Sequence, residues 1–346
     1  MSDFLRRLGI AHPIILAPMA GGAGTPELVA AVSNAGGLGS WGGAYSTPQQ
    51  ILDATRQIRA LTDKPFALNL FAGGYEPERN VDPAPMLELV SRVHAELGLP
   101  PPVLPPNPPS PLEDQLAAVI EARPAVFSFT FGIPAGNALA RTRKAGILTS
   151  GTATTVEEAK ALAEAGVDNI VCQGEEAGAH RGTFLRPFEQ SMVAARELVA
   201  NTLKAVSVPV VASGGLMDGT DIAAMLKLGA AAAQLGTAFL PCQECGAPVV
   251  YKHAVLTARR DTTTITRAYS GRPARGLRNR FMELAREEDI LPFRQQNDLT
   301  RPMRGEAGKK GVVDYLSLWA GRGVTRARQM PAAELVKTLV DEIALA

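Results

Sequence analysis

Residues 169–182 read NIVCQGEEAGAHRG, a short apolar run that passes directly into a glycine-rich stretch. A β-branched run of this length that ends at a glycine predicts a buried strand instead of a helix. The stretch behind it places one imidazole, His180, and two carboxylates among small residues. The segment therefore predicts a strand that ends in a loop equipped for chemistry, and the fold depends on how often the strand pattern recurs.

The strand pattern recurs along most of the chain. Short runs rich in apolar and β-branched residues alternate with longer segments of helical period, which is typical of parallel βαβ units. Several runs are apolar throughout, as expected for strands that are buried on both faces. We predict eight strands, over residues 13–17, 38–41, 66–71, 126–131, 147–150, 169–173, 209–213 and 231–235.

The helices between these strands have recognisable boundaries. Thr25 and Thr47 each precede a proline, which is the order of an N-cap and a first helical residue. Thr155 and Glu158 have the spacing of a capping box, and Gly229 stands where a helix should end. Eight strands with crossover helices predict an α/β fold, a closed (β/α)8 TIM-type barrel, with a doubly wound open sheet as the competing architecture.

Two regions break the alternation. Residues 99–111 are dense in proline, which predicts an extended strap on the surface. Residues 241–324 show no clear βα period, whereas apolar residues near the C-terminus return to helical spacing. We therefore predict a barrel domain of residues 1–240 plus 325–346. A smaller, mainly helical capping or substrate domain, residues 241–324, is inserted after the eighth strand.

Composition limits the partners of this protein. The 346 residues are 46% hydrophobic and 20% charged, which is typical of a soluble globular protein. A formal net charge of +1 gives no overall attraction to nucleic acid. No apolar run approaches the ~18 residues of a membrane span, and the N-terminus lacks the core of a signal peptide. We expect a cytoplasmic protein that binds neither nucleic acid nor membrane; the oligomeric state stays open, a homodimer included.

Two cysteine and glycine motifs carry little weight. Cys242 and Cys245 form a CxxC pair, but a structural zinc needs about four ligands and no second pair accompanies them. We predict no metal site. Residues 37–42 match GxGxxG, yet these glycines overlap a predicted strand instead of following it, which argues against a dinucleotide fold. With Cys172, the cysteines are too few for a disulfide framework and suit a reducing compartment.

The loops after the seventh and eighth strands predict a phosphate site. Barrel enzymes work at the C-terminal ends of their strands, and these two loops often hold a phosphate. Gly214 and Gly215 follow the seventh strand, and Gly236 and Thr237 follow the eighth. Glycines let backbone N–H groups approach an anion with no Cβ in the way. Tight turns alone would explain either pair, but two pairs in the expected loops favour phosphate.

His180 and Asn69 complete the candidate site. A histidine on a glycine-rich loop at this end of a barrel suits proton transfer near neutral pH, although a bond to a neighbouring carboxylate would also explain it. Asn69 ends the third strand, where an amide can recognise a heteroaromatic edge with both a donor and an acceptor. By itself the amide of Asn69 does not identify a ligand.

On these motifs the chain resembles the nitronate monooxygenases, also called nitropropane dioxygenases, over nearly its whole length. The most specific motifs are residues 17–22, 128–132, 173–182, 234–239, 270–276 and 317–321. The resemblance implies that His180 is the active-site acid or base. It also implies FMN held by Met19, Asn69, Gln173, Gly178, Gly215, Gln234, Gly236 and Thr237, to which we add Gly214 and Leu235 of the same loops. In one departure, Ala179 stands where the family's Glu-Ala-Gly-Gly-His motif has its second glycine, so a methyl group restricts the loop or crowds the flavin edge.

The resemblance also implies the reaction. FMN would oxidise alkyl nitronates such as propionate 3-nitronate with O2, giving a carbonyl compound and nitrite, so the partners are a small anionic nitronate and O2. The alternative is an NAD(P)H-dependent flavin reductase of quinones or enoyl thioesters on the same barrel. A non-catalytic barrel that binds a flavin or a phosphosugar is a third hypothesis.

Overall fold

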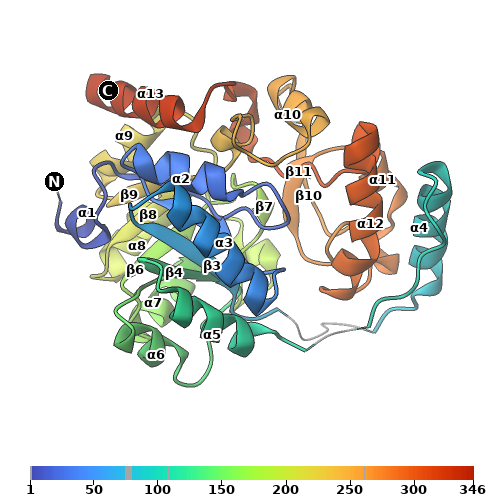
Figure 1. Ribbon diagram of the computed structural model, residues 1–346, viewed down its shortest axis with the longest axis horizontal. Helices are drawn as coiled ribbons and strands as arrows, with labels where there is room; N and C mark the ends of the chain where they lie inside the picture. The colour runs from blue at the N-terminus through green and yellow to red at the C-terminus, as the bar shows by residue number, and fades with distance from the viewer. Residues whose placement is uncertain (1, 75–79, 107–108, 261) are drawn as a thin grey trace.

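The computed structural model describes residues 2–74, 80–106, 109–260 and 262–346, and its centre is a ring of eight parallel strands (Figure 1). Neighbouring strands follow the order β1-β9-β8-β6-β5-β4-β3-β2. The ring closes between β1 and β2, because Leu16 N donates to Leu38 O and Leu38 N donates to Ile14 O, both at 2.9 Å. The predicted closed barrel is therefore confirmed. Its strands are β1 (Ile14–Leu16), β2 (Gly39–Gly42), β3 (Phe66–Phe71), β4 (Val126–Thr130), β5 (Leu148–Ala153), β6 (Asn169–Gln173), β8 (Val210–Ser213) and β9 (Ala232–Leu235).

Each predicted run overlaps one of these strands, and the differences lie at the strand ends. The largest is at β5, which continues to Ala153 because Thr152 and Ala153 pair with Val171 and Cys172 of β6. Small and polar residues do not mark a strand by themselves, so only the neighbouring strand reveals this extension. The glycines of residues 37–42 lie in or beside β2, as the sequence indicated.

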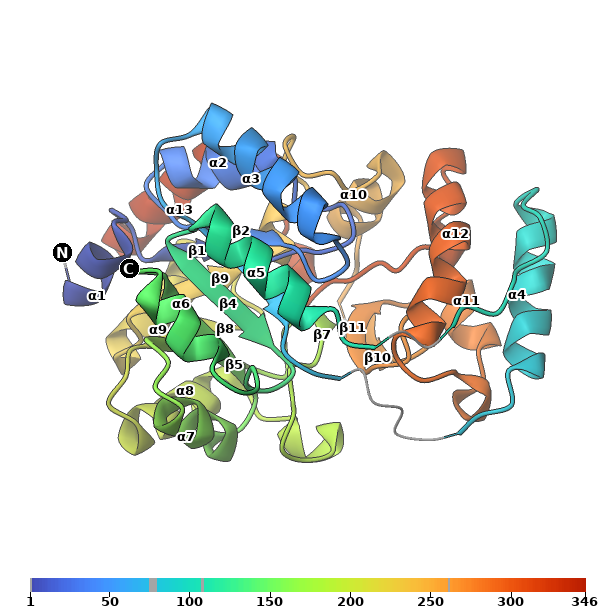
Figure 2. The same cartoon turned by 60° about the horizontal axis from the view of Figure 1, so that its bottom comes forward.

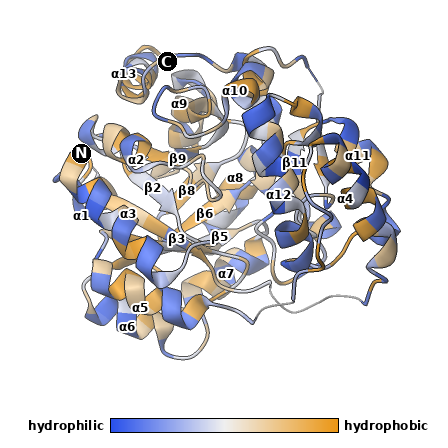
Figure 3. Cartoon of the chain, turned by 45° about the vertical axis from the view of Figure 1, so that its right-hand side comes forward, coloured by the Kyte–Doolittle hydropathy of each residue, from blue (hydrophilic) through white to orange (hydrophobic). Residues whose placement is uncertain are grey.

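The helices that follow the strands form the outer layer of the barrel. The terminal helix α13 contacts α9 and α2, which confirms that the end of the chain returns to the barrel. In Figure 3 the barrel strands are mostly hydrophobic, whereas the helices carry hydrophilic residues on their outer faces. The outer helices are α2 (Pro26–Asn34), α3 (Pro48–Leu61), α5 (Leu112–Ala122), α6 (Ala138–Lys144), α7 (Val156–Glu164), α8 (Ala195–Ala205), α9 (Gly219–Leu228) and α13 (Ala332–Leu345).

Helix capping follows the sequence in most places. Side-chain N-caps are confirmed at Thr25, Thr47 and Thr155. The capping box predicted for Thr155 is wrong in its second half. The carboxylate of Glu158 is buried and accepts hydrogen bonds from Thr154 N, at 2.7 Å, and from the loop behind β7. The side chain of Glu158 makes these contacts in place of the hydrogen bond that would complete the capping box.

The N-terminal helix α1 (Asp3–Leu8) closes the bottom of the barrel. Its residues Phe4, Leu5 and Leu8 are buried in a separate hydrophobic cluster. The cluster also holds inward-facing residues near the start of the strands: Ile15, Leu38, Ala67, Val126, Val171, Val211 and Ala232. Since apolar side chains fill this end, a ligand can enter only from the end where the strands finish.

That open end is covered by residues between β9 and α13, which lie to one side of the barrel in Figures 1 and 2. A two-residue strand from the barrel, β7 (Ala179–His180), joins their antiparallel sheet in the order β10-β11-β7. The cover consists of α10 (Val249–Leu256), β10 (Thr263–Thr266), β11 (Ala274–Leu277), α11 (Arg280–Leu284) and α12 (Gln295–Lys310), with 3-10 helices at Thr237–Phe239, Glu287–Asp289, Val313–Tyr315 and Arg322–Arg326. A further 3-10 helix, Phe188–Ser191, follows β7.

Helix α4 (Ala84–Glu96) belongs to the connection between β3 and β4, yet it lies beside α12 (Figure 2). Lys310 Nζ of α12 donates to Leu97 O at 2.6 Å. The proline-dense stretch leads back from α4 to the barrel. Its described residues form no helix or strand before Leu112, Val103 is 84% exposed, and residues 107 and 108 lie outside the described residues. In the described part, the predicted surface strap is confirmed. The domain boundaries of residues 240 and 325 stay a prediction.

Within the described ranges, no helix has both the length and the apolar character that a membrane span requires.

Candidate active site

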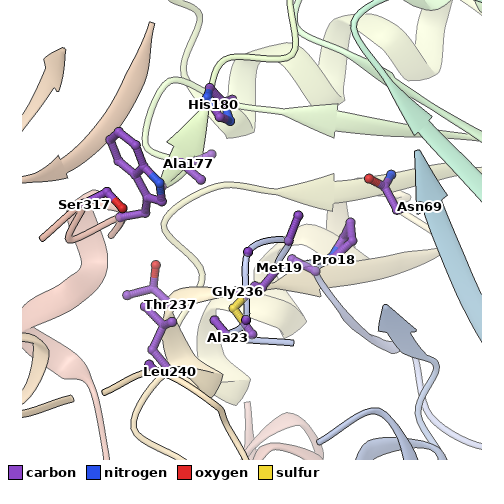
Figure 4. Close-up of a pocket in the computed structure, with 18 of the residues that line it drawn as sticks. Pro18, Met19, Ala23, Asn69, Ala177, His180, Gly236, Thr237, Leu240 and Ser317 are labelled. Carbon is purple, nitrogen blue, oxygen red and sulfur yellow. The ribbon is translucent and has the colours of Figure 1, made fainter. Parts of the chain in front are cut away.

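A cavity of about 630 Å³ opens where the barrel strands end, beneath the cover (Figure 4). The ends of β6, β8 and β9 supply Gln173, Ser213 and Leu235 to its wall. Every site residue predicted from the sequence lines this cavity. These are His180, Met19, Asn69, Gln173, Gly178, Gly214, Gly215, Gln234, Leu235, Gly236 and Thr237.

The two glycine loops present unbonded backbone amides to the cavity. Gly214 and Gly215 have backbone φ angles of +121° and +71°, which residues other than glycine rarely adopt. A Cβ on Gly236 would lie 3.3 Å from the Cβ of Ala17. Among the described residues, the amides of these three glycines donate no hydrogen bond. Unsatisfied N–H groups on neighbouring loops form a nest for an anion such as a phosphate.

Thr237 connects this nest to the end of the cover. Its Oγ1 accepts a hydrogen bond from Gly321 N at 3.0 Å, which leaves the hydroxyl proton for an anion. A Cβ on Gly178 would lie 2.6 Å from the backbone N of Gly321, so this glycine allows the cover to pack on the loop after β6. The loop after β9, the loop after β6 and the cover therefore meet at Gly321.

Two amide side chains are held in defined positions. Asn69 is buried and donates to Ser128 Oγ at 3.0 Å. Gln173 donates to His180 O at 2.9 Å and accepts from Gly182 N at 2.8 Å. Both ends of the Gln173 amide thus hold the chain around His180, a positioning role that the sequence did not indicate.

His180 lies on a strand, so the prediction of a free glycine-rich loop is wrong at this residue. Strand β7 pairs with β11, with Ala274 opposite His180 and Arg275 opposite Ala179. Ala179 has φ of +62°, a left-handed conformation that costs a non-glycine residue roughly 1–2 kcal/mol. The pairing of Ala179 and His180 with β11 holds the backbone of this segment in that conformation.

Aromatic rings surround the imidazole of His180. The ring centroids of Phe71, Phe131, Phe293 and Trp319 lie 6.1, 5.7, 6.1 and 5.8 Å from that of His180. Burial lowers the pKa of His180 to about 3, with the nearby Arg272 and Arg304 guanidinium groups as further causes. The imidazole is therefore neutral at physiological pH.

Ser270, which belongs to the motif of residues 270–276 but was not among the predicted site residues, lies beside the imidazole. His180 Nε2 lies 2.8 Å from Ser270 Oγ. The same hydroxyl lies 3.2 Å from Arg272 O and 3.3 Å from Arg272 N. A hydroxyl has one proton. If it donates to Arg272 O, His180 carries its proton on Nε2; if it donates to Nε2, the proton is on Nδ1.

The cavity wall is cationic. Among the described residues, its charged side chains are Arg301, Arg304 and Lys309 of α12, and no carboxylate lines it. These residues were missed because α12 follows no barrel motif. The spacing of Asn297, Arg301, Arg304 and Gly308 on one helical face was the available signal. An anionic ligand is the chemistry that this wall favours.

The cysteines take no part in this site. Cys242 and Cys245 are free and buried in the main hydrophobic core. Burial is the main reason that the pKa of each thiol is raised, and it raises the pKa of Cys242 to about 12. Both thiols are therefore protonated at neutral pH. Neither lines the cavity.

Known proteins are similar to this chain over nearly its whole length. The model of a family described as nitronate monooxygenase matches residues 2–342. A nitronate monooxygenase from Pseudomonas aeruginosa is 42% identical over 353 residues, which cover 99% of each chain. A solved nitroalkane oxidase from Streptomyces ansochromogenes has a TM-score of 0.91 at 38% identity and covers 100% of this chain and 99% of its own. FabK from Thermotoga maritima has a TM-score of 0.78 at 27% identity, with 100% and 96% covered.

Proposed function

Because this chain belongs to the nitronate monooxygenase family, we propose that it uses FMN and O2 to oxidise alkyl nitronates to carbonyl compounds and nitrite. The family makes it a flavin-dependent monooxygenase; FMN and the alkyl nitronate are the proposed details. The observation that carries the proposal is that all predicted flavin residues and His180 line one cavity.

The residues of the cavity fit FMN. The amides of Gly214, Gly215 and Gly236 and the hydroxyl of Thr237 would hold its phosphate. Asn69 and Gln234 would bind polar edges of the ring system, since both line the same cavity. One amide nest provides for one phosphate, which favours FMN over FAD. When bound, the flavin supplies the acceptor for two electrons from the substrate.

The side chain of His180 would orient the nitronate. A nitronate arrives already deprotonated, so it needs a hydrogen-bond donor and no base. A neutral imidazole with its proton on Nδ1 can donate one hydrogen bond to a nitronate oxygen, while Nε2 accepts from Ser270. The aromatic rings beside the imidazole are apolar, and a hydrogen bond to an anion is stronger in such surroundings.

The proposal is tested with the purified protein in two measurements. Mass spectrometry of the released cofactor should give FMN. Mixing with propyl 1-nitronate in air should consume O2 and release nitrite. A protein that cannot be loaded with any flavin, or one that holds FMN but leaves the nitronate unchanged, would contradict the proposal.

A further inference from the structure

A short turn of the cover, residues 321–326, packs on both glycine loops of the phosphate nest. At its start, Gly321 N donates to Thr237 Oγ1, in the loop after β9, at 3.0 Å. In its middle, a Cβ on Gly323 would lie 2.5 Å from Gly215 O, in the loop after β8. Glycine at this position therefore lets the turn approach the carbonyl of Gly215 closely.

Arg326, at the end of the turn, makes the polar contacts with the loop after β8. Its Nη2 donates to Gly215 O at 3.2 Å. The same guanidinium pairs with Asp218 at 2.7 Å and with Asp221 at 2.8 Å. Asp221 in turn accepts a hydrogen bond from Met217 N at 2.8 Å. One side chain thus connects the loop from Gly215 to the first turn of α9.

The contact with Arg326 sets the direction of the peptide between Gly215 and Leu216. A trans peptide is planar, and its carbonyl and N–H point to opposite sides. Gly215 and Leu216 line the cavity, whereas Gly323 and Arg326, which the carbonyl faces, do not. The N–H of Leu216 therefore faces the cavity. Among the described residues it donates no hydrogen bond, and Gly215 O accepts one only from Arg326.

We infer that Arg326 is a positioning residue for the cofactor: it holds Gly215 O outward and thereby aims the N–H of Leu216 at the FMN phosphate, as a fourth amide of the nest. This inference rests on the proposed function, in which FMN is the cofactor. Without Arg326 the peptide can turn its carbonyl toward the phosphate, which repels it. Loss of one hydrogen bond to a charged group corresponds to roughly one to two powers of ten in affinity. We expect the lower value, because the three glycine amides remain.

The test compares two flavins that differ in one group, since riboflavin is FMN without the phosphate. Each is titrated into the full chain after its flavin has been removed. Arg326→Gln should raise the Kd of FMN about tenfold and leave the Kd of riboflavin within about twofold. Once loaded with FMN, the variant should oxidise propyl 1-nitronate with the kcat and KM of the wild type, because Arg326 does not line the cavity.

The matched control is Arg7→Gln. Arg7 is 45% exposed, against 44% for Arg326, and pairs with a carboxylate, that of Asp168, at the same distance of 2.7 Å. It belongs to α1, at the closed end of the barrel. The control should change the Kd of neither flavin.

Two further measurements separate the direction of the peptide from a simple effect of charge. Salt at about 0.5 M screens the attraction between exposed charges, but it does not turn a peptide. The ratio of the FMN Kd values of Arg326→Gln and wild type should therefore persist in about 0.5 M NaCl. Gly323→Ala keeps every charge but pushes the turn away from Gly215 O, so it should show the same selective loss of FMN affinity. It also carries the comparison if Arg326→Gln does not fold.

Three results would overturn the inference. The first is an unchanged Kd of FMN in Arg326→Gln. The second is an equal rise of Kd for FMN and riboflavin, which would show a general loss of structure. The third is a loss of the difference in salt, which would make Arg326 a screened charge. Each leaves FMN binding and nitronate oxidation by the wild type intact, so the proposed function would survive. A wild type that binds riboflavin as tightly as FMN, or neither flavin, would contradict the proposed FMN site and this inference together.

Discussion

His180 combines a defined position with a neutral charge. Strand pairing fixes its backbone, Ser270 fixes its ring, and burial among aromatic rings keeps the imidazole deprotonated. A neutral imidazole can donate to a nitronate oxygen, or it can accept the Cα proton of a neutral nitroalkane. The two roles need the ring proton on different nitrogens. The substrate form that the enzyme prefers therefore shows which tautomer of His180 is populated.

Replacing His180 by asparagine should separate these roles. Asparagine keeps approximate size and one donor, so FMN should stay bound. Loss of a positioned base costs on the order of 10² to 10⁴ in rate, whereas loss of a hydrogen bond to a charged group costs about one to two powers of ten. Activity on any neutral nitroalkane should therefore fall far more than activity on its nitronate, for which KM should rise. Steady-state kinetics on the two forms, after flavin content is checked, measure this; unchanged kinetics on both would make His180 a structural residue.

Acid should destabilise the protein through the same residue. Histidine titrates near pH 6.5 in an unfolded chain, and folding lowers the pKa of His180 to about 3. Between these two pKa values the unfolded state binds a proton that the folded state does not bind. The stabilisation present above about pH 6.5 is therefore lost as the pH falls toward 3. The test is urea unfolding of the wild type and His180→Asn at pH 7.5 and pH 5. Relative to the variant, the free energy of unfolding of the wild type should be lower at pH 5 than at pH 7.5. A difference independent of pH would be inconsistent with a buried neutral imidazole.

Among single residues, the sequence located those whose role depends on local motifs. The glycines after β8 and β9 and the histidine after β6 are recognisable because barrel geometry places them at the strand ends. Ser270 lies 90 positions from His180 in the chain. The motif of residues 270–276 marked its segment, but its contact with His180 depends on the pairing of β11 with β7, which no local pattern indicates.

At the scale of loops, Gly236 offers the cleaner test of the phosphate site. Its φ of −116° is accessible to any residue, whereas a side chain on Gly215 would be strained by a φ of +71°. Gly236→Val should therefore fold while its side chain fills the space of the phosphate. We expect most of the bound FMN to be lost, measured by flavin absorbance per protein. Full occupancy with unchanged affinity would place the phosphate elsewhere.

Glu158 ties α7 to the loop that follows β7. Its fully buried carboxylate accepts from Thr154 N and Oγ1, both at 2.7 Å, and from Phe184 N at 2.6 Å. Glu158→Gln would turn an amide donor toward these donors, so we expect a loss of about 2–4 kcal/mol in the free energy of unfolding. The exposed neighbour Glu157→Gln is the matched control and should change it by less than about 0.5 kcal/mol. Equal effects in urea unfolding would show that the buried contacts do not stabilise the loop.

The elements themselves were predictable to different degrees. Barrel strands are buried on both faces, so apolar runs mark them clearly, and all of them were found. Strand β7 is two residues long and pairs with a segment far along the chain. Helix α12 is largely polar and contains Pro302, so its apolar pattern was too weak to read.

At the scale of the whole molecule, the cover and the barrel both line the candidate active site. The barrel supplies the glycine loops and Asn69, and the cover supplies Ser270, Trp319 and the cationic face of α12. The barrel could be predicted from its repeating pattern. The cover could be predicted only as a region without that pattern, because its place over the cavity is set by contacts between distant segments.

The central claim is that nitronates are the electron donors of the bound flavin. The alternative is an NAD(P)H-dependent flavin reductase on the same barrel, so reduction of the flavin by NADH is the result to exclude. The deciding measurement mixes the FMN-loaded protein anaerobically with propyl 1-nitronate, propionate 3-nitronate or NADH in a stopped-flow spectrophotometer. The account predicts rapid bleaching of the flavin by the nitronates and, at most, slow bleaching by NADH. Rapid bleaching by NADH alone would contradict it and would assign the cavity to a flavin reductase.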